Sequence, residues 1–268
     1  MQSAASAPEL LTVQMFWHGA SLSRIERLCM ASFLAHGHPL DLYVYDTPAS
    51  IPLGVRLMPA EQILPRDLLF RHRRTGSLGS FSDWFRYQLL KERGGIWADA
   101  DVVCLAPLLY PQAEIFGWQD ARYINNAVLG LPAGHELAVW LAACCAAPNR
   151  LLPYDNLPMR LRKLRRRYFA GNRRDRVRWG EYGPKGLTQA VRHLGYINMA
   201  KPVPHFYPVS CENWLEMFAS RGGAQPPWTP QSRAVHLWQQ MMHSTPGFDK
   251  NGRFPADSPF EVLCRRFL

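Results

Sequence analysis

Residues 80–105, SFSDWFRYQLLKERGGIWADADVVCL, decide the fold that the sequence predicts. Apolar residues recur at helical spacing through the first half of this stretch, and Asp83 stands three positions after Ser80. A serine followed by an acid at this distance is typical of the capping box that opens a helix, and paired glycines are typical of a helix end. The sequence therefore predicts a helix that begins at Ser80 and ends at Gly94 and Gly95.

A short apolar strand, residues 96–98, follows the glycines and leads into Asp99 and Asp101. Because alternate residues of an extended chain point to the same side, we expect both carboxylates to face one site at the end of the strand. Carboxylate oxygens are preferred ligands of Mg²⁺ and Mn²⁺. The pattern favours a site where a bound cation holds a diphosphate. Asp-x-Asp alone is a weak signal, because it also arises by chance.

The residues around the acidic pair make the signal specific. The pattern S-D-x-x-R-Y-x-x-L-x-x-x-G-G-I-W-x-D-x-D resembles the donor-sugar region of retaining glycosyltransferases with a DXD motif. It is similar to family 32, which includes bacterial enzymes of capsular and surface polysaccharides, and more distantly to the glucosylating clostridial toxins. The matching residues are Ser82, Asp83, Arg86, Tyr87, Leu90, Gly94, Gly95, Ile96, Trp97, Asp99 and Asp101.

We expect one α/β domain over residues 1–268, because the chain is long enough to bury one large core. The resemblance implies a GT-A-type fold, in which a mixed central sheet is flanked by helices. Its Rossmann-like half, residues 10–130, is expected to bind the nucleotide sugar. Residues 131–268 are expected to form the acceptor side, with a basic insertion at 159–178.

Hydrophobic periodicity predicts the other elements. Residues 12–17 and 40–46 are predicted strands joined by a helix that begins at Ser21 or Ser23, an order typical of nucleotide-binding units. Residues 47–79 are expected to be a winding connection. The chain is apolar again at 102–105. Further strands are expected at 114–118, 123–131 and 202–210, and helices at 134–147, around 187–194 and from near Cys211.

The resemblance assigns roles to the acidic pair and to the helix before it. Asp101 is implied as a direct metal ligand, and Asp99 as a contact to ribose or sugar hydroxyls and to the metal shell. Asp83 and Arg86 are three positions apart and share a helix face. Both are implied to hold the donor sugar, with Arg86 also near the diphosphate, and Tyr87 is counted among the donor-binding residues. For Asp83, capping the helix remains an alternative.

Four residues outside this stretch receive roles in the same way. Trp17 is implied to contact the nucleotide base, with burial in the core as the alternative. Asn126 is implied to contact sugar hydroxyls, although asparagine at a strand start is also common turn chemistry. His236 is implied to complete the metal shell, with a structural histidine as the alternative, and Trp238 to donate its indole N–H to the diphosphate. The expected cofactor is Mn²⁺, or Mg²⁺.

The net charge of +10 comes mostly from residues 159–178, which hold ten Lys or Arg and one acid. This run fits a solvated helix face, and equally a peripheral contact of residues 160–178 with anionic lipid or an acidic glycan. Nucleic-acid binding is disfavoured because stacking aromatics are scarce there.

The sequence shows no long apolar run, no basic-then-apolar N-terminal signal, no C-x-x-C pair among six cysteines and no N-x-S/T site. These features predict a soluble bacterial protein with reduced, buried thiols. The expected location is the cytoplasm, including the inner face of the membrane.

The predicted activity is metal-dependent transfer of a hexosyl group from a nucleotide-diphosphate sugar to a glycan, a lipid-linked saccharide or a protein. UDP-hexose is the first choice of donor and GDP-mannose the second. Retention of configuration rests on the resemblance alone, because no third carboxylate stands out as a nucleophile. A nucleotidyltransferase using the same acidic pair and a non-enzymatic basic nucleic-acid-binding protein remain as alternatives.

Overall fold

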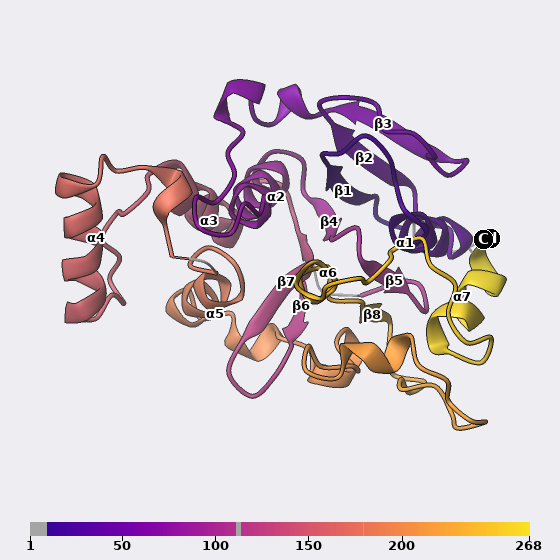
Figure 1. Cartoon of the computed structure of the whole chain (residues 1–268). Helices are drawn as coiled ribbons and strands as arrows, with labels where there is room; N and C mark the ends of the chain where they lie inside the picture. The colour runs from indigo at the N-terminus through magenta and orange to yellow at the C-terminus, as the bar shows by residue number, and fades with distance from the viewer. Residues whose placement is uncertain (1–9, 111–113, 179) are drawn as a thin grey trace, which may run out of the picture. The chain divides into compact units, whose positions relative to one another are not determined.

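The structure is a computed structural model that describes residues 10–110, 114–178 and 180–268 (Figure 1). Residues 1–9, part of the N-terminus for which the sequence predicts no secretion signal, lie outside these residues. The described chain forms two compact units that interleave in sequence. Unit 1 comprises Met1–Met58, Ala98–Ala113 and Pro202–Leu268, and unit 2 comprises Pro59–Trp97 and Glu114–Lys201.

Unit 1 contains parallel strands, a small antiparallel pair and three α-helices. Its larger sheet runs β3-β2-β1, with β1 and β2 parallel over their whole length. Helix α1 packs against β2, β5 and α7. The elements are β1 (Val13–Trp17), α1 (Arg24–Ala35), β2 (Leu40–Val44), β3 (Val55–Pro59, which crosses into unit 2 at its last residue), β5 (Val102–Cys104), β8 (Ala234–His236), α6 (Gln239–Ser244) and α7 (Pro259–Phe267).

Unit 2 contains strands in the order β4-β7-β6 with helices packed on them. Strands β6 and β7 are antiparallel, and α2 and α5 both pack against β7 and α3 (Figure 1). The elements are α2 (Gly79–Arg93), β4 (Gly95–Ala98), β6 (Ile115–Trp118), β7 (Ile124–Leu131), α3 (Glu136–Ala146), α4 (Leu157–Phe169) and α5 (Pro184–His193). Parallel and antiparallel strands flanked by helices confirm the expected α/β class and are consistent with the GT-A type.

Helix α1 begins where the sequence predicts. Ser23 is its N-cap and accepts a hydrogen bond from the backbone of Ile25, while Glu26 reaches back to the Ser23 amide at 2.7 Å. This capping box satisfies amides that have no partner inside the helix. The strand, helix, strand order predicted for residues 12–46 is thereby confirmed.

Helix α2 begins differently from the prediction. Its first residue is Gly79 and its N-cap is Leu78, without a side-chain cap. The hydroxyl of Ser77 accepts the Gly79 amide at 3.1 Å, so the chain turns into the helix before Ser80 is reached. The predicted capping box at Ser80 is therefore wrong, and the capping alternative for Asp83 is removed.

The paired glycines at the end of α2 are required by the backbone. Gly94 and Gly95 have φ of 64° and 90°, a region that L residues rarely adopt. A Cβ on Gly94 would lie 2.4 Å from the amide nitrogen of Ala133. The glycines thus allow an immediate turn from α2 into β4, which ends next to Asp99.

Two predicted segments differ in the structure. Residues 202–210 form a 3₁₀ turn at Val203–His205 and no strand, because the prolines in this stretch lack the amide needed to extend a sheet. The expected helix near Cys211 is only a 3₁₀ turn, Trp214–Met217. Strand β3 lies within the segment predicted as a winding connection. Its residues do not alternate between buried and exposed, so the sequence lacks the usual pattern of a strand.

The core of unit 1 joins distant parts of the chain. Ile25 and Leu28 of α1, Val103 of β5, Val235 of β8 and Phe260 of α7 are all fully buried in one hydrophobic cluster. Burial of each such side chain contributes about 1.5–3 kcal/mol. The same cluster therefore fixes β8 against β5, which decides where His236 lies.

All six cysteines are free, and all except Cys211 are buried. Among the helices of the described residues, none combines the length and apolar character needed to cross a bilayer.

Candidate functional site

The acidic pair of unit 1 lies in a tight turn between β4 and β5. The Val102 amide donates to the Asp99 carbonyl at 3.0 Å, so residues 99–102 are curled rather than extended. The sequence-based reason for placing the two carboxylates together, strand alternation, is therefore wrong. Their proximity is nevertheless confirmed, because the turn brings Asp99 and Asp101 to one side.

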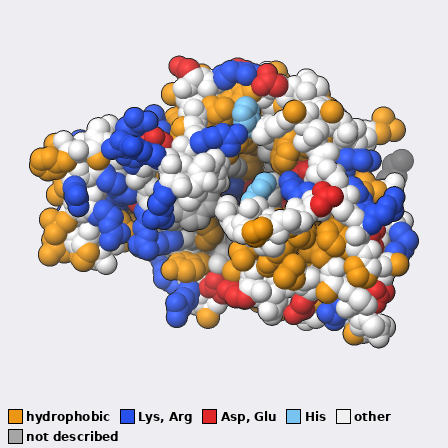
Figure 2. Space-filling view, in the orientation of Figure 1, with side chains coloured by type: hydrophobic (Ala, Val, Ile, Leu, Met, Phe, Trp, Pro, Cys, Tyr) orange, Lys and Arg blue, Asp and Glu red, His pale blue; other side chains and the backbone are white. Residues whose placement is uncertain are grey.

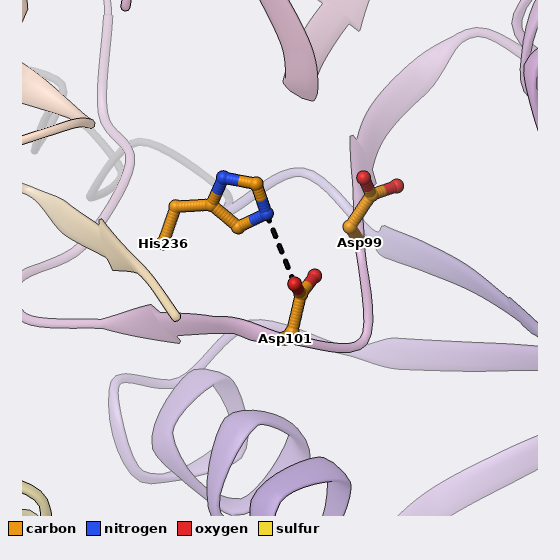
Figure 3. Close-up of side chains that lie close together, drawn as sticks. All are labelled: Asp99, Asp101 and His236. Atoms are coloured by element: carbon orange, nitrogen blue, oxygen red, sulfur yellow. Dashed lines mark ion pairs between the residues drawn. The ribbon is translucent and has the colours of Figure 1, made fainter. Parts of the chain in front are cut away.

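Strand pairing brings the histidine to this turn. Strands β5 and β8 are antiparallel, with Val102 opposite His236, and the Leu237 amide donates to the Asp101 carbonyl at 2.8 Å. His236 Nε2 lies 3.0 Å from Asp101 Oδ2 (Figure 3). Ala98–Ala113 and Pro202–Leu268 belong to the same unit, so this contact is part of a single packed body.

The backbone at Trp238 completes the surroundings of Asp101. Trp238 has φ 58° and ψ 56°, a left-handed conformation that costs a bulky residue about 1–2 kcal/mol. This conformation aims the Gln239 amide at Asp101 Oδ2, at 2.6 Å, and packs the indole against the His236 ring, with ring centroids 4.2 Å apart and the ring planes tilted by 43°. The strain therefore serves the orientation of Asp101 and His236.

Asp99, Asp101 and His236 together fit a divalent cation. One ligand atom from each lies within 4.8 Å of the other two, and Figure 3 shows the three side chains around a common space. Around one cation with ligands at about 2.1 Å, neighbouring ligands are about 3 Å apart and opposite ligands about 4 Å. Two carboxylates and one imidazole are a donor set that such cations accept. This group of residues is called the metal centre below.

The charge state of Asp101 suits this role. Burial by itself raises the pKa of the Asp101 carboxyl, but the electrostatic interaction and hydrogen bond with His236 and the hydrogen bond from the Gln239 amide outweigh it. The pKa of Asp101 is consequently below its usual value. The carboxylate is ionised at neutral pH although it is only 5% exposed.

The two tryptophans assigned to donor binding also lie in unit 1. The Trp238 indole N–H donates to the Val209 carbonyl at 2.9 Å, so the expected donation to a diphosphate requires that bond to open. Trp17 stands at the end of β1 and is half-buried. Its indole nitrogen is buried and has no hydrogen-bond partner among the described residues.

Sequence reasoning missed Lys250 beside Trp17. The Lys250 ammonium lies 5.3 Å from the centroid of the Trp17 ring and forms an ion pair with the buried Glu26 of α1. Lys250 comes from a loop without periodicity, so no sequence pattern singles it out. It adds a cation next to the residue expected to contact a nucleotide.

The remaining predicted residues lie together in unit 2. Asp83, Arg86 and Tyr87 on α2 and Asn126 on β7 are all at most 9% exposed, and we call them the buried polar cluster. Asn126 Nδ2 donates to Asp83 Oδ1 at 2.7 Å and to the Tyr87 hydroxyl oxygen at 3.0 Å. Arg86 donates to the Asn126 carbonyl at 2.5 Å. Asn126 therefore connects the helix to the strand, which turn chemistry alone does not explain.

The cluster carries charges in a nearly dry environment. Arg86 lies 3.9 Å from Asp83, and its guanidinium carbon is 4.9 Å from the centroid of the Trp97 ring. Burial, followed by the charge of Asp83, raises the pKa of Tyr87 well above its usual value, so Tyr87 stays neutral. Buried ion pairs are expensive and contribute little net stability. An arrangement of this kind is typical of a site that binds polar ligands.

Residues 183–188, GPKGLT, at the start of α5, border this cluster within unit 2. The Tyr87 hydroxyl donates to the Tyr182 carbonyl at 2.7 Å. A Cβ on Gly183, the N-cap of α5, would lie 3.4 Å from Asp83 Oδ2. The absence of a side chain at Gly183 thus leaves one Asp83 oxygen with space beside it.

The predicted site residues accordingly fall into two groups. The structure brings Asp99, Asp101 and His236 together in unit 1, with Trp238 against His236. It brings the buried polar cluster together in unit 2.

Comparison with known proteins identifies the central stretch. Residues 74–121 match the family described as "Glycosyltransferase sugar-binding region containing DXD motif". The D-x-D of this stretch is Asp99-Ala100-Asp101. Residues 74–121 therefore carry a glycosyltransferase sugar-binding region, which confirms that part of the resemblance.

The chain is also similar to a human protein, alpha-1,4-N-acetylglucosaminyltransferase, with 25% identity over 173 residues. The match covers 60% of this chain and 42% of the human protein, so the chain spans less than half the length of this curated relative.

Two solved structures share weaker similarity. The PaToxG glycosyltransferase matches at 12% identity with a TM-score of 0.43, over 69% of this chain and 68% of that one. The apo structure of the WbbM bifunctional glycosyltransferase matches at 10% identity with a TM-score of 0.35, over 98% and 52%.

Proposed function

We propose that this chain is a metal-dependent, retaining glycosyltransferase that moves a hexosyl group from a nucleotide-diphosphate sugar to a saccharide or protein acceptor. The observation that carries the proposal is the convergence of Asp99, Asp101 and His236, because the two aspartates belong to the matched DXD region. The favoured cation is Mn²⁺, since an imidazole among the ligands suits it better than Mg²⁺.

The residues of the metal centre would hold the leaving diphosphate. Cleavage of the bond between sugar and diphosphate builds negative charge on the phosphate oxygen, and a bound divalent cation supplies neutralising charge there. Asp101 and His236 would be direct ligands, and Asp99 would divide its oxygens between the cation and ribose or sugar hydroxyls. The low pKa of Asp101 supports this assignment, because a ligating carboxylate must be ionised.

Trp17 and Lys250 would serve the nucleotide. The Trp17 ring offers a stacking surface for a base, and its indole N–H lacks an acceptor in the described structure. The Lys250 ammonium beside that ring would attract phosphate oxygens. Trp238 is proposed to hold the His236 ring in orientation and to reach the diphosphate only when its bond to Val209 opens.

The buried polar cluster would bind the sugar. Asp83 and Arg86 lie within the matched residues 74–121, and this supports their assignment to the donor. Asn126 and Tyr87 would fix Asp83 and Arg86 in place and present further hydrogen-bonding groups to sugar hydroxyls. We propose residues 10–130 as the donor half and 131–268 as the acceptor half of one domain.

The donor is proposed to be a UDP-hexose. UDP-N-acetylglucosamine is the first to test, given the name of the human relative, and GDP-mannose is the second choice. The test incubates the chain with UDP- and GDP-sugars and Mn²⁺ and measures nucleotide release. One donor should be hydrolysed slowly without acceptor, and Asp101→Asn should lower that rate at least 100-fold.

Cys211→Ser is a suitable control, because this thiol lies outside both groups and should leave hydrolysis unchanged. Turnover of nucleoside triphosphates by the same residues would favour a nucleotidyltransferase. RNA binding without any sugar-nucleotide hydrolysis would favour the non-enzymatic alternative. For retention, proton NMR of the first product from an α-linked donor should show an α linkage, and a β linkage would refute it.

A further inference from the structure

Helix α4 of unit 2 places its apolar residues on the outside. Leu157, Leu161, Leu164 and Tyr168 follow at intervals of four, three and four, so they form one stripe along the helix. Leu157, Leu161 and Tyr168 are 68%, 58% and 68% exposed. Leu164 is half-buried. A helix of a globular protein normally buries such a stripe, whereas α4 exposes the other three residues.

The inner side of α4 is held by charged groups. Lys163 is the only buried residue among those described in this helix, and its ammonium donates to both oxygens of Asp155 at 2.9 and 2.8 Å. Arg166 donates to both oxygens of Glu181 at 3.0 and 2.9 Å. These pairs fix the rotation of the helix, so the outward direction of the stripe is specified by the fold.

Arginines flank the stripe on both sides. At 100° per residue, Arg160 and Arg167 lie on one side of the stripe and Arg165 on the other. All three are exposed, and none forms an ion pair with a described residue. Figure 2 shows Lys and Arg side chains gathered around α4, with hydrophobic side chains exposed along its outer edge.

We propose that α4 is a docking helix for an anionic lipid surface. An exposed apolar stripe between rows of arginines matches a helix that lies in the headgroup region, with leucines directed into the acyl boundary and arginines on anionic headgroups. Polar surfaces such as nucleic acid or an acidic glycan would meet the arginines but leave the leucines in water. The surface lies outside the proposed catalytic groups, so binding is measurable without donor or acceptor.

The test is flotation of the full chain with vesicles of phosphatidylcholine alone or with about one third phosphatidylglycerol. We expect binding only to the anionic vesicles, weakened by salt. Leu161→Ser should weaken binding at least tenfold, because a leucine leaves the acyl boundary. The triple variant Arg160→Gln, Arg165→Gln, Arg167→Gln should weaken it about 100-fold, at about fivefold per arginine.

Helix α7 and the loop before it offer matched controls. Val262 is 43% exposed, so Val262→Ser should leave binding unchanged. The exposed arginines Arg253, Arg265 and Arg266, changed to Gln together, remove the same net charge without altering α4. All these residues are at the surface, so melting temperatures should stay close to that of the unchanged chain.

A dye locates the contact. An environment-sensitive dye on Leu161→Cys, in a Cys211→Ser background, should shift to shorter wavelength on anionic vesicles, whereas the same dye on Val262→Cys should not. Equal binding to neutral vesicles or an unshifted dye at position 161 would overturn the proposal. Binding of RNA or an acidic polysaccharide in place of vesicles would also overturn it, as would a concentration-dependent dimer abolished by Leu161→Ser.

Discussion

At the scale of single residues, the surroundings of Asp101 explain why a histidine far along the chain belongs to the acidic pair. Asp101 is 5% exposed, and one of its oxygens meets both His236 and the Gln239 amide. A buried carboxylate without partners would cost several kcal/mol. The fold thus supplies two partners before any cation arrives, and a cation would take over part of their role.

His236→Gln is expected to raise the Mn²⁺ concentration needed for half-maximal donor hydrolysis by at least tenfold. The variant removes one of the three proposed ligands, while Asp99 and Asp101 would still supply two. The measurement is hydrolysis rate against Mn²⁺ concentration, with saturating Mn²⁺ restoring part of the rate. Melting temperatures of both proteins are needed as well, because loss of His236 also leaves Asp101 with one partner fewer.

His243 provides the matched control for this prediction. It lies on α6, bonded to Gln239 Nε2 at 3.0 Å, and is not part of the Asp99–Asp101–His236 group. His243→Gln should therefore leave the Mn²⁺ dependence within about twofold. An equal effect of both substitutions would show that His236 acts through general stability and not as a ligand.

At the scale of elements, α7 holds α1 through a partly buried ion pair. Arg24, the first residue of α1, donates two hydrogen bonds to Glu261 at 2.8 and 2.9 Å. The Phe254 amide adds a third at 3.0 Å. The Arg24 hydrogen bonds lower the pKa of Glu261 to about 2, against a partial opposing effect of burial. The ion pair holds α1, and α1 packs on β5. It therefore supports the strand that pairs with β8, where His236 lies.

Glu261→Gln is expected to lower the free energy of unfolding by about 2 kcal/mol at pH 7. A carboxyl whose pKa is lower in the folded than in the unfolded state stabilises the fold above the unfolded value of about 4.3. This contribution declines as pH falls from about 4.3 towards 2. Urea unfolding at pH 7 and pH 3.5 should therefore show a smaller difference between the two proteins at pH 3.5. A constant difference would mean that packing, not charge, supplies the stability.

Local patterns predicted most elements because their causes are local. The apolar runs of β1 and β7 and the capping box of α1 all lie within a few residues. The Ser80 cap failed because Ser77, three positions earlier, satisfies the first amide of α2. The strand expected at 202–210 does not form. Its apolar residues suggested a strand, but its prolines cannot donate the backbone hydrogen bonds that a strand needs.

The same distinction between local and distant causes applies to the candidate site. The proximity of Asp99 and Asp101 follows from their separation of two residues, although a turn and not a strand produces it. The bond from Asn126 to Asp83 and the place of Lys250 beside Trp17 depend on packing between distant segments. No periodicity in one sequence encodes such contacts, so a family resemblance was needed for Asn126 and nothing indicated Lys250.

At the scale of the whole molecule, cation and nucleotide should stabilise the chain only in combination. The first proposed phosphate contacts are those of the metal centre and Lys250, and the cation would connect Asp101 to the diphosphate. A ligand present at 100 times its dissociation constant stabilises the folded state by about 2.7 kcal/mol. For a chain of this size that corresponds to a rise in melting temperature of about 5–10 °C.

We expect UDP with Mn²⁺ to raise the melting temperature by this amount, whereas UDP with a chelator or Mn²⁺ alone should raise it by less than about 2 °C. Asp101→Asn should abolish the joint effect, because its side chain at position 101 no longer offers a charged ligand. GDP in place of UDP tests the choice of base by the same measurement. An equal rise in melting temperature with UDP in the presence of chelator would show that the nucleotide binds without the metal centre. That outcome would refute a diphosphate bound through Asp99, Asp101 and His236, while leaving the membrane contact of α4 untouched, because vesicle binding depends on none of these three residues.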